Sequence, residues 1–327
     1  MPPSRKSTGN TASRAKSSRA KSSRAEPSHA KAARPVQRPS PKPRLNGAMA
    51  CDTAFRIVAR RHLDALAASR DATCEGDPTA LHQMRVALTH LRTAILFFSP
   101  MVEDAVRNEI RDELKWLNGE LGAVRDLDVA VERVVSMDKK RPEALSAVGA
   151  WEEKRAEGHR DLARMLRSVR YEWLIEQTAG WIENGPWSTK KGKEAAAERA
   201  TPIGLYTLDK LDEWEKKLLK RSRKLRKMGT KKRHRLRLLN KKLTYSIDSF
   251  EDLFENRNFS KQKIALKHLR KAQRSLGQLN DGARGHEIAQ ELQRSGVQTM
   301  LEFLRPKKKK RLLKKASRAY RKLDKLN

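Results

Sequence analysis

The sequence is poor in cysteine and in long apolar runs. Only two cysteines occur among 327 residues, Cys51 and Cys74, without a CxxC pair or a suitably spaced histidine. Neither a disulfide framework nor a tetrahedral metal site is therefore indicated. Arg92 interrupts the longest apolar candidate, between Val86 and Val102. Because a secretory leader is also lacking, we expect a cytoplasmic protein without a membrane anchor.

Strand patterns are lacking as well. No stretch alternates apolar and polar residues over several β-branched positions, and glycine and proline are sparse after residue 50. Apolar residues recur with a helical period in Phe55–Leu66, Val106–Leu117 and Leu211–Leu225. The sequence therefore predicts an all-α domain over residues 48–327, long enough to bury two helix-bundle cores.

Residues 1–47 have a different composition, with 12 lysines and arginines against 1 glutamate. They contain two successive Ser-Arg-Ala-Lys-Ser repeats and a proline-rich stretch from Pro35 to Pro43. High charge without apolar periodicity predicts a disordered basic tail, which we interpret as a tether to a polyanion such as DNA. An organelle transit peptide is the alternative interpretation of this tail.

A basic amphipathic helix is predicted twice. In the first copy His82, Arg85 and Arg92 fall near one helical stripe beside apolar positions that form a packed face. In the second copy His234, Arg237 and Lys241 follow the same layout. A row of guanidinium and imidazole groups suits an extended polyanion, although either copy alone is also typical of a solvated charged face.

A second motif follows each basic helix at a similar distance. Leu121-Gly122-x-x-Arg125-Asp126 begins 39 residues after His82, and Leu276-Gly277-x-x-Asn280-Asp281 begins 42 residues after His234. One helical unit is therefore duplicated, with the first unit at about 48–200 and the second at about 201–327. Related units that pack about a pseudo-two-fold axis would bring both basic stripes into one cleft.

These elements together resemble the CHAD domain, the conserved-histidine alpha-helical domain, over roughly residues 50 to 327. The resemblance implies two pseudo-symmetric four-helix bundles around a basic central cleft that binds inorganic polyphosphate and has no catalytic activity. Thr89, His90 and Thr244 stand where the family often carries further arginines, while Lys241 and Lys242 restore charge in the second copy. We therefore expect an uneven basic face.

The charge is concentrated in the second unit. Residues 201–327 carry 37 lysines and arginines against 13 acidic residues, whereas residues 48–200 carry 24 against 25. A field of this size predicts strong, salt-sensitive attraction to a polyanion, without choosing among polyphosphate, nucleic acid and an anionic surface.

The predicted polyphosphate contacts come from both units. They are His82, Arg85, Arg92, Lys115 and Arg125 from the first, and His234, Arg237, Lys241, Arg270, Lys271 and Arg274 from the second. Arginines would form bidentate bonds to phosphoryl oxygens and lysines would act as point charges. Histidines that gain protons beside phosphate would make affinity rise as pH falls through about 6.5. A further stripe on one helical face either lines the same cleft or is solvated; it comprises Lys263, Lys267, Arg270 and Arg274.

Catalytic and metal-binding interpretations are weaker. Glu213-Trp-Glu215-Lys-Lys217 matches the ExExK pattern of triphosphate tunnel hydrolases, but a helix would point the two carboxylates about 200° apart. His82, His90, His234 and His268 lack carboxylate partners at ligand spacing. We interpret Asp126, Asp128 and Asp281 as side chains that orient arginines or cap helices. No enzymatic activity, cofactor or metal is expected.

Two functions remain in view. The first is a polyphosphate-binding protein associated with polyphosphate granules, and the second is a nucleic-acid-binding, nucleoid-type protein that acts mainly through its basic tails. No tryptophan forms a spaced stacking platform with the basic helices, and Trp116 and Trp173 are expected in the core. The basic run Lys307–Arg311 is interpreted as the start of a last amphipathic helix built on Leu312 and Leu323.

Overall fold

The computed structural model describes residues 44–138, 145–254, 260–294 and 305–326, and this part of the chain is helical, without a named strand. The expected all-α class is confirmed. Most of the predicted tail, residues 1–43, lies outside the described residues. Within the described residues no helix is both long enough and apolar enough to cross a bilayer.

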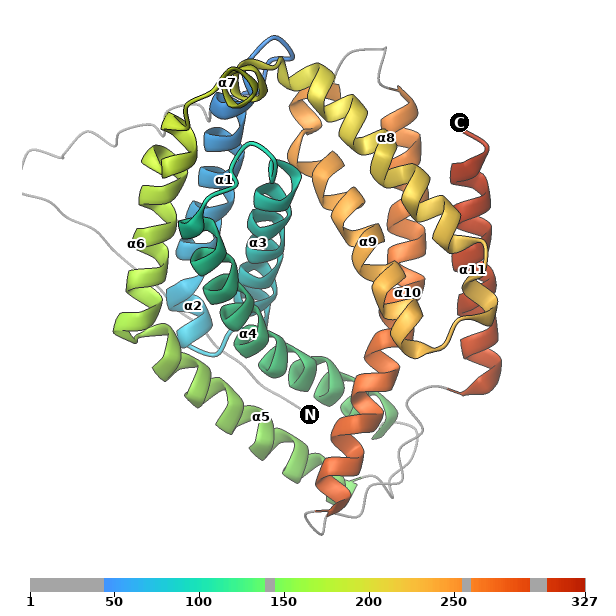
Figure 1. Cartoon of the computed structure of the whole chain (residues 1–327). Coiled ribbons are helices and arrows are strands. Elements are labelled where there is room, and N and C mark those ends of the chain that lie inside the picture. Colours follow the sequence, from blue (N-terminus) through green and yellow to red (C-terminus); the bar gives the residue numbers. More distant parts are fainter. Residues whose placement is uncertain (1–43, 139–144, 255–259, 295–304, 327) are drawn as a thin grey trace, which may run out of the picture. The chain divides into compact units, whose positions relative to one another are not determined.

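The first half of the domain forms one four-helix bundle (Figure 1). Its bundle helices are α1 (Cys51–Ala68), α3 (Pro78–Phe97), α4 (Ala105–Asp138) and α6 (Val169–Asn184). Between and after them run α2 (Arg70–Cys74), α5 (Leu145–Leu166), the 3₁₀ turn η2 (Pro186–Thr189) and α7 (Lys193–Ala200). Helix α5 packs along α4 on the outside of the bundle.

The second half repeats this arrangement with four helices that pack in a ring. They are α8 (Ile203–Ser222), α9 (Thr230–Ser249), α10 (Ser260–Arg294) and α11 (Pro306–Asp324), with the 3₁₀ turns η3 (Leu225–Lys227) and η4 (Glu251–Phe254). The predicted boundary between the units, at residues 200 and 201, falls in the connection from α7 to α8.

The helix that carries the first basic motif begins with a strong local signal. The Asp77 carboxylate accepts a hydrogen bond from the backbone N–H of Thr79 at 2.7 Å, and Pro78 occupies the first helical position. An acidic N-cap and a proline that needs no hydrogen-bond partner both favour a helix start there. This start fixes the register in which His82 and Arg85 follow one turn later.

The two halves contact each other through equivalent helices. Cys51 N–H donates to the Thr201 carbonyl at 3.0 Å, and Ile203 N–H donates to the Met49 carbonyl at 2.8 Å, so the starts of α1 and α8 pair with each other. Further along, α3 packs against α9 and α4 packs against α10. The helices that carry equivalent motifs therefore meet across the junction, as the duplication predicts.

An aromatic cluster closes the junction at the ends of α3 and α9. The ring of Phe97 lies 4.7 Å from that of Phe250 and 5.6 Å from that of Trp214. Phe98 stacks on Tyr206 at 5.6 Å, and the Tyr206 hydroxyl donates to the Phe97 carbonyl at 2.7 Å. Both halves thus share one continuous core, which includes the ends of α3 and α9.

The structure confirms one expectation about the core and overturns another. Leu312 and Leu323 are buried on the inner face of α11, as predicted for the last helix. Trp116 is partly buried, with the Arg170 guanidinium 3.7 Å above its ring. The expectation for Trp173 is wrong, because this side chain is 42% exposed on the outer face of α6.

Candidate functional site

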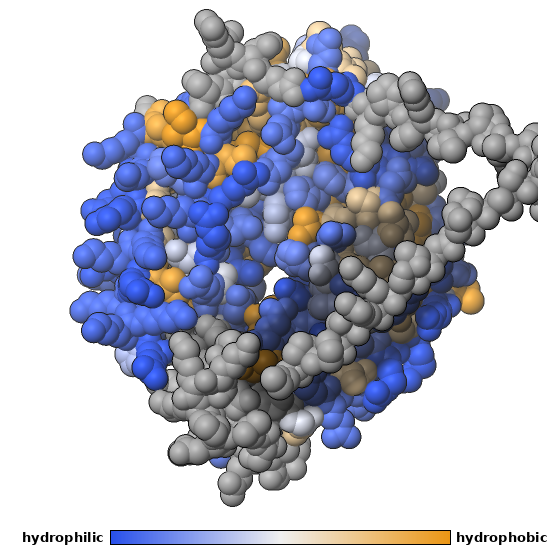
Figure 2. All heavy atoms as spheres, turned by 180° about the vertical axis from the view of Figure 1, so that it is seen from behind, coloured by the Kyte–Doolittle hydropathy of each residue, from blue (hydrophilic) through white to orange (hydrophobic). Residues whose placement is uncertain are grey.

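A cleft of about 1880 Å³ lies between the two halves and is lined mainly by α3, α4, α9 and α10. Twelve lysines and arginines line it, against three carboxylates, which are those of Asp126, Asp281 and Glu287. Figure 2 shows a hollow bordered by hydrophilic side chains near the centre of the view. Because the cations converge on one cavity, the cleft carries a strong positive potential.

Seven of the predicted contact residues line the cleft: His82, Arg85, Arg92, Arg125, His234, Arg237 and Lys241. Lys115 is exposed on α4 and is not part of the lining. Arg270, Lys271 and Arg274 are exposed on the N-terminal part of α10, whereas the cleft meets α10 only from Leu276 onward. A helix of 35 residues extends past the cavity, so a stripe on one part of it need not face the same space as another part.

Several basic residues of the lining were not predicted as contacts: Arg111, Lys231, Arg233, Arg235, Lys242, Arg284, His286 and Lys309. The residues on α9 flank His234 in one basic run, and this run was the available signal for them. Arg111 precedes Arg125 by 14 residues, which also places both on one helical face. Lys309 comes from α11, which no pattern in the sequence connects with the cleft.

Arg85 is held in place by contacts to α4. Its guanidinium donates to the Gly122 carbonyl at 3.1 Å and lies 4.0 Å from the Asp126 carboxylate. The other Asp126 oxygen accepts from Arg284 of α10 at 3.0 Å. The interpretation of Asp126 as a residue that orients arginines is confirmed, and its carboxylate also links the two halves.

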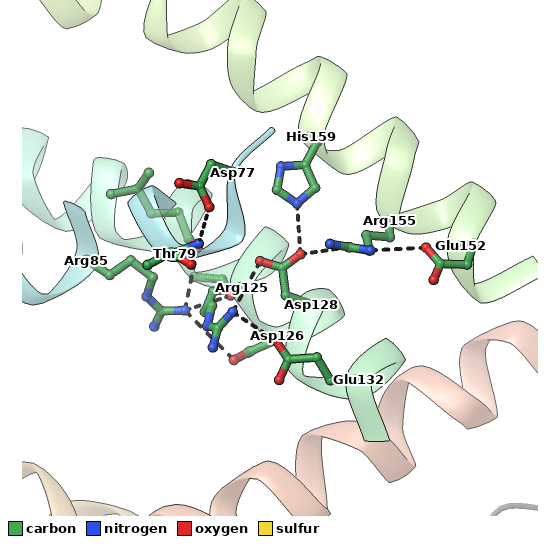
Figure 3. Close-up of polar contacts among 12 residues, drawn as sticks. Asp77, Thr79, Arg85, Arg125, Asp126, Asp128, Glu132, Glu152, Arg155 and His159 are labelled. Carbon is green, nitrogen blue, oxygen red and sulfur yellow. Dashed lines mark hydrogen bonds and ion pairs between the residues drawn. The ribbon is translucent and has the colours of Figure 1, made fainter. Parts of the chain in front are cut away.

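Arg125 is positioned by a buried carboxylate on its own helix (Figure 3). Asp128 is buried and lies 3.5 Å from Arg125, while it accepts hydrogen bonds from His159 at 2.8 Å and Arg155 at 3.0 Å. Burial raises the pKa of Asp128, but the hydrogen bonds from His159 and Arg155 outweigh it and hold this pKa below its usual value. Asp128 thus fixes Arg125 and ties α5 to α4, as its interpretation as an orienting residue predicted.

The equivalent position in the second half is arranged differently. His234 Nδ1 lies 3.1 Å from Asn280 Oδ1, so an asparagine stands where the first half has Arg125. The Nε of Arg237 is buried and has no hydrogen-bond partner among the described residues. A buried donor without a partner is costly, which leaves this Nε–H ready to donate a hydrogen bond to a ligand oxygen.

Lys241 lies deep in the cleft among cations from both halves. Burial and the nearby charges of Arg237 and Arg85 lower its pKa to about 7, against the opposing effect of Asp281 and Asp126. Burial, followed by Arg125, Arg85 and Lys241, lowers the pKa of His82 as well. Mutual repulsion among these groups shows how little negative charge the cleft itself supplies.

The cleft is closed where α3 and α9 converge. Ser249 Oγ lies 2.9 Å from His62 Nε2 and 3.1 Å from His90 Nδ1, and the His90 ring lies 4.4 Å from that of Tyr245. Burial is the main cause that lowers the pKa of His62 to about 3 and that of His90 to about 4. Both imidazoles are therefore neutral at pH 7 and form part of the junction.

Among the described residues, no group of three or more His, Cys, Asp and Glu side chains is placed to hold a metal ion. Glu213 and Glu215 belong to helix α8, as expected for the ExExK match, and Glu215 is buried while Glu213 is exposed. His268 lies outside the cleft, on the part of α10 near Lys322 of α11.

One family model and two solved structures match this chain. The family model described as the CHAD domain matches residues 57–290. The crystal structure of the CHAD domain from the plant Ricinus communis is similar over 88% of this chain and 93% of that chain, with a TM-score of 0.69 and 23% identity. PptA from Streptomyces chartreusis is similar over 85% of this chain and 96% of that chain, with a TM-score of 0.53 and 12% identity. Comparison with curated proteins gave no match.

Proposed function

From the premise that this chain belongs to the CHAD family, we propose that its cleft binds inorganic polyphosphate and catalyses no reaction on it. The observation that carries the proposal is the excess of cations in one cavity, with twelve lysines and arginines against three carboxylates. The two motif arginines, Arg85 and Arg237, face this cavity from opposite halves and lie close enough to affect each other's charge. A linear phosphate polymer would neutralise both walls at once.

The chemistry of the lining favours phosphate. Arginine binds phosphoryl oxygens through two parallel N–H donors, and these charge-assisted bonds are about twice as strong as neutral ones. Arg85 is already fixed by the Gly122 carbonyl and Asp126, so little side-chain entropy is lost when it binds. Arg237 brings a buried donor that lacks a partner among the described residues.

The size of the cleft favours a polymer over a small molecule. Pockets for small ligands usually measure about 300–1000 Å³, whereas this cleft measures about 1880 Å³. Its wall on α4 runs from Arg111 to Val129, which corresponds to roughly 27 Å of helix. A chain of phosphates matches such an elongated space and its distributed charge.

Binding without catalysis also fits the state of the lining carboxylates. The Asp126 carboxylate pairs with Arg85 and Arg284, and the Glu287 carboxylate pairs with Arg284. Both carboxylates therefore serve to orient cations. A protein that only holds polyphosphate would accumulate where the polymer does, on polyphosphate granules. Inorganic polyphosphate is then its principal partner, and DNA a competitor attracted by the remaining basic charge.

The test is a titration of the full chain with long-chain polyphosphate and with duplex DNA at matched phosphate concentration. Arg85→Ala combined with Arg237→Ala should weaken polyphosphate binding roughly 100-fold, because two charge-assisted contacts are lost. Arg160→Ala combined with Arg167→Ala removes the same charge from exposed positions outside the cleft and should have little effect.

The same titrations on a chain that lacks residues 1–43 separate the cleft from the tail, because Leu45 is buried in the core and the Gly204 N–H donates to the Gly47 carbonyl. Polyphosphate affinity should be nearly unchanged by this truncation and should survive salt that releases DNA. Equal affinity for the two polymers, loss of binding with the tail, or equal loss in both double variants would each contradict the proposal.

A further inference from the structure

Helix α11 presents a continuous cationic stripe that the cleft does not contain. Its inner face is buried, and the hydroxyl of Tyr320 donates to Asn240 of α9 at 3.0 Å, so the orientation of the helix is fixed. Its outer stripe occurs at offsets 0, 4, 7, 11, 14 and 18, which fall on one face of a helix. The stripe comprises Lys307, Arg311, Lys314, Arg318, Arg321 and Lys325, all exposed.

This stripe lacks the carboxylates that usually balance surface cations. Within the described part of the chain none of the six side chains makes an ion pair, and Asp324 is the acidic residue of α11. Like charges at spacings of three and four residues destabilise a helix. Lysines from Lys307 to Lys310 also occupy the first turn, where the helix dipole favours negative charge. A helix with this charge pattern is suited to a bound polyanion.

The stripe and the cleft meet at the first turn of α11, where exposed Lys308 and Lys310 flank the helix between the cleft-facing side and the stripe. Lys309 in the first turn of α11 lines the cavity, together with Lys231 and Arg233 at the start of α9. From there the exposed stripe runs away along α11 to Lys325. Figure 2 shows long hydrophilic side chains projecting from the left edge of the molecule, the side on which α11 lies in this reversed view.

The predicted basic stripe of α10 adjoins this surface. Lys267 and Lys271 of α10 and Lys322 of α11 lie close to His268, where, after burial, their charges lower its pKa. These lysines are exposed and do not line the cleft. The part of α10 that the proposed function leaves unexplained therefore widens the basic surface of α11.

The chemistry of the stripe distinguishes between possible occupants. A helix that inserts into a membrane interface needs an exposed apolar face, but Leu312, Ala316 and Leu323 of α11 are buried in the core. Single-stranded nucleic acid is usually bound through stacking on aromatic side chains, and Tyr320 is only 3% exposed. A bare chain of phosphates needs neither an apolar face nor aromatic side chains, because cations alone neutralise it.

We infer that a polyphosphate chain too long for the cleft leaves it past Lys309 and continues along the exposed stripe of α11, which forms an outer section of the same site. This inference rests on the proposed function. From Lys307 to Lys325 the stripe spans roughly 27 Å, about as much as the cleft wall on α4. The outer section makes affinity depend on chain length beyond the point at which the cleft is full.

The test compares a short polyphosphate, no longer than about 27 Å, with a chain several times that length, on the full-length protein. The outer variant replaces Arg311, Lys314, Arg318, Arg321 and Lys325 by glutamine. The control variant makes the same change at Arg160, Arg167, Lys190, Lys191 and Lys193, which are exposed, outside the cleft and on the other half. Both variants lose the same net charge and leave the core unchanged.

For the long chain, the outer variant should lower the slope of log affinity against log salt by about 3.5, since each of the five contacts contributes about 0.7 on a single strand. Its affinity for the short chain should stay within about twofold of the control, because the lining of the cleft is intact. The inference is overturned if the outer and control variants bind long chains equally, or if the outer variant loses affinity for duplex DNA alone.

The cleft variant Arg85→Ala with Arg237→Ala separates this inference from the proposed function. If the cleft variant weakens both chain lengths while the outer variant weakens neither, only the inference fails. If the cleft variant binds both lengths normally, the proposed function fails first. Circular dichroism melting of all variants confirms that a lost affinity is not a lost fold.

Discussion

Polyphosphate binding should take up a proton at Lys241. In the free protein burial and the charges of Arg237 and Arg85 lower the pKa of this ammonium group to about 7. A bound phosphate chain favours the charged form and returns the pKa toward the ordinary lysine value of about 10.4. The free protein is then partly neutral at Lys241 where the complex is fully charged.

The sign and size of the effect follow from this difference. Below pH 7 Lys241 is charged in both states and binding is independent of its titration. Above pH 7 the free protein must first gain the proton, so the dissociation constant rises about tenfold between pH 6 and pH 8. At pH 8 each bound chain should take up about 0.9 proton at this site. The contribution that the sequence led us to expect from His82 near pH 6.5 should appear at a lower pH, since burial and the charges of Arg125, Arg85 and Lys241 lower the pKa of His82.

Isothermal titration calorimetry in buffers of different ionisation enthalpy measures this proton uptake directly. Lys241→Arg keeps the charge at all pH values, so it should remove both the proton uptake at pH 8 and the rise in dissociation constant. Lys271→Arg, exposed and outside the cleft, is the matched control and should keep both. If Lys241→Arg retains the same pH dependence, the assignment to Lys241 is refuted.

Two further predictions concern stability. Burial is the main cause that lowers the pKa of His62 to about 3 and of His90 to about 4. Between these values and about 6.5 the unfolded chain binds more protons, so stability decreases as the pH is lowered, by up to about 1.4 kcal/mol per pH unit for each histidine. Thermal melts at pH 5 and pH 7 should show a smaller loss for His90→Gln than for the unmodified protein; an equal loss would contradict this. Asp128→Asn leaves buried cations without their carboxylate and should lower the free energy of unfolding in urea by about 3 kcal/mol, whereas Asp161→Asn at an exposed ion pair should lower it by less than about 1 kcal/mol; similar losses would argue against the role of Asp128.

The sequence was sufficient for what depends on local spacing. The offset from His82 to Arg85 and from His234 to Arg237 is set within single helices, and duplication implied that these helices meet, as α3 and α9 do. The role of Asp128 also followed from sequence, because carboxylates beside an anion-binding surface need cationic partners.

The remaining features of the site, namely which cations face the cleft and which contacts join the halves, depend on where helices end and cross. Residue spacing within one helix does not encode this. Arg270 and Arg274 share a helix with cleft residues, yet the cavity reaches α10 only from Leu276 onward. Arg284 enters the site because Asp126 of the other half accepts its hydrogen bond. Such contacts join residues 158 positions apart, and no local pattern predicts them.

The two walls of the cleft contribute differently to binding. On the first half, Arg85 and Arg125 are fixed by carbonyl and carboxylate groups, and the charge of this half is nearly balanced. On the second half, Arg237 keeps a buried donor without a partner among the described residues, and Lys241 is repelled by its neighbours. Fixed cations determine where phosphates sit, while cations that repel one another gain most from the arrival of negative charge. A duplicated unit has thus diverged into one half that sets geometry and another that supplies the attractive field.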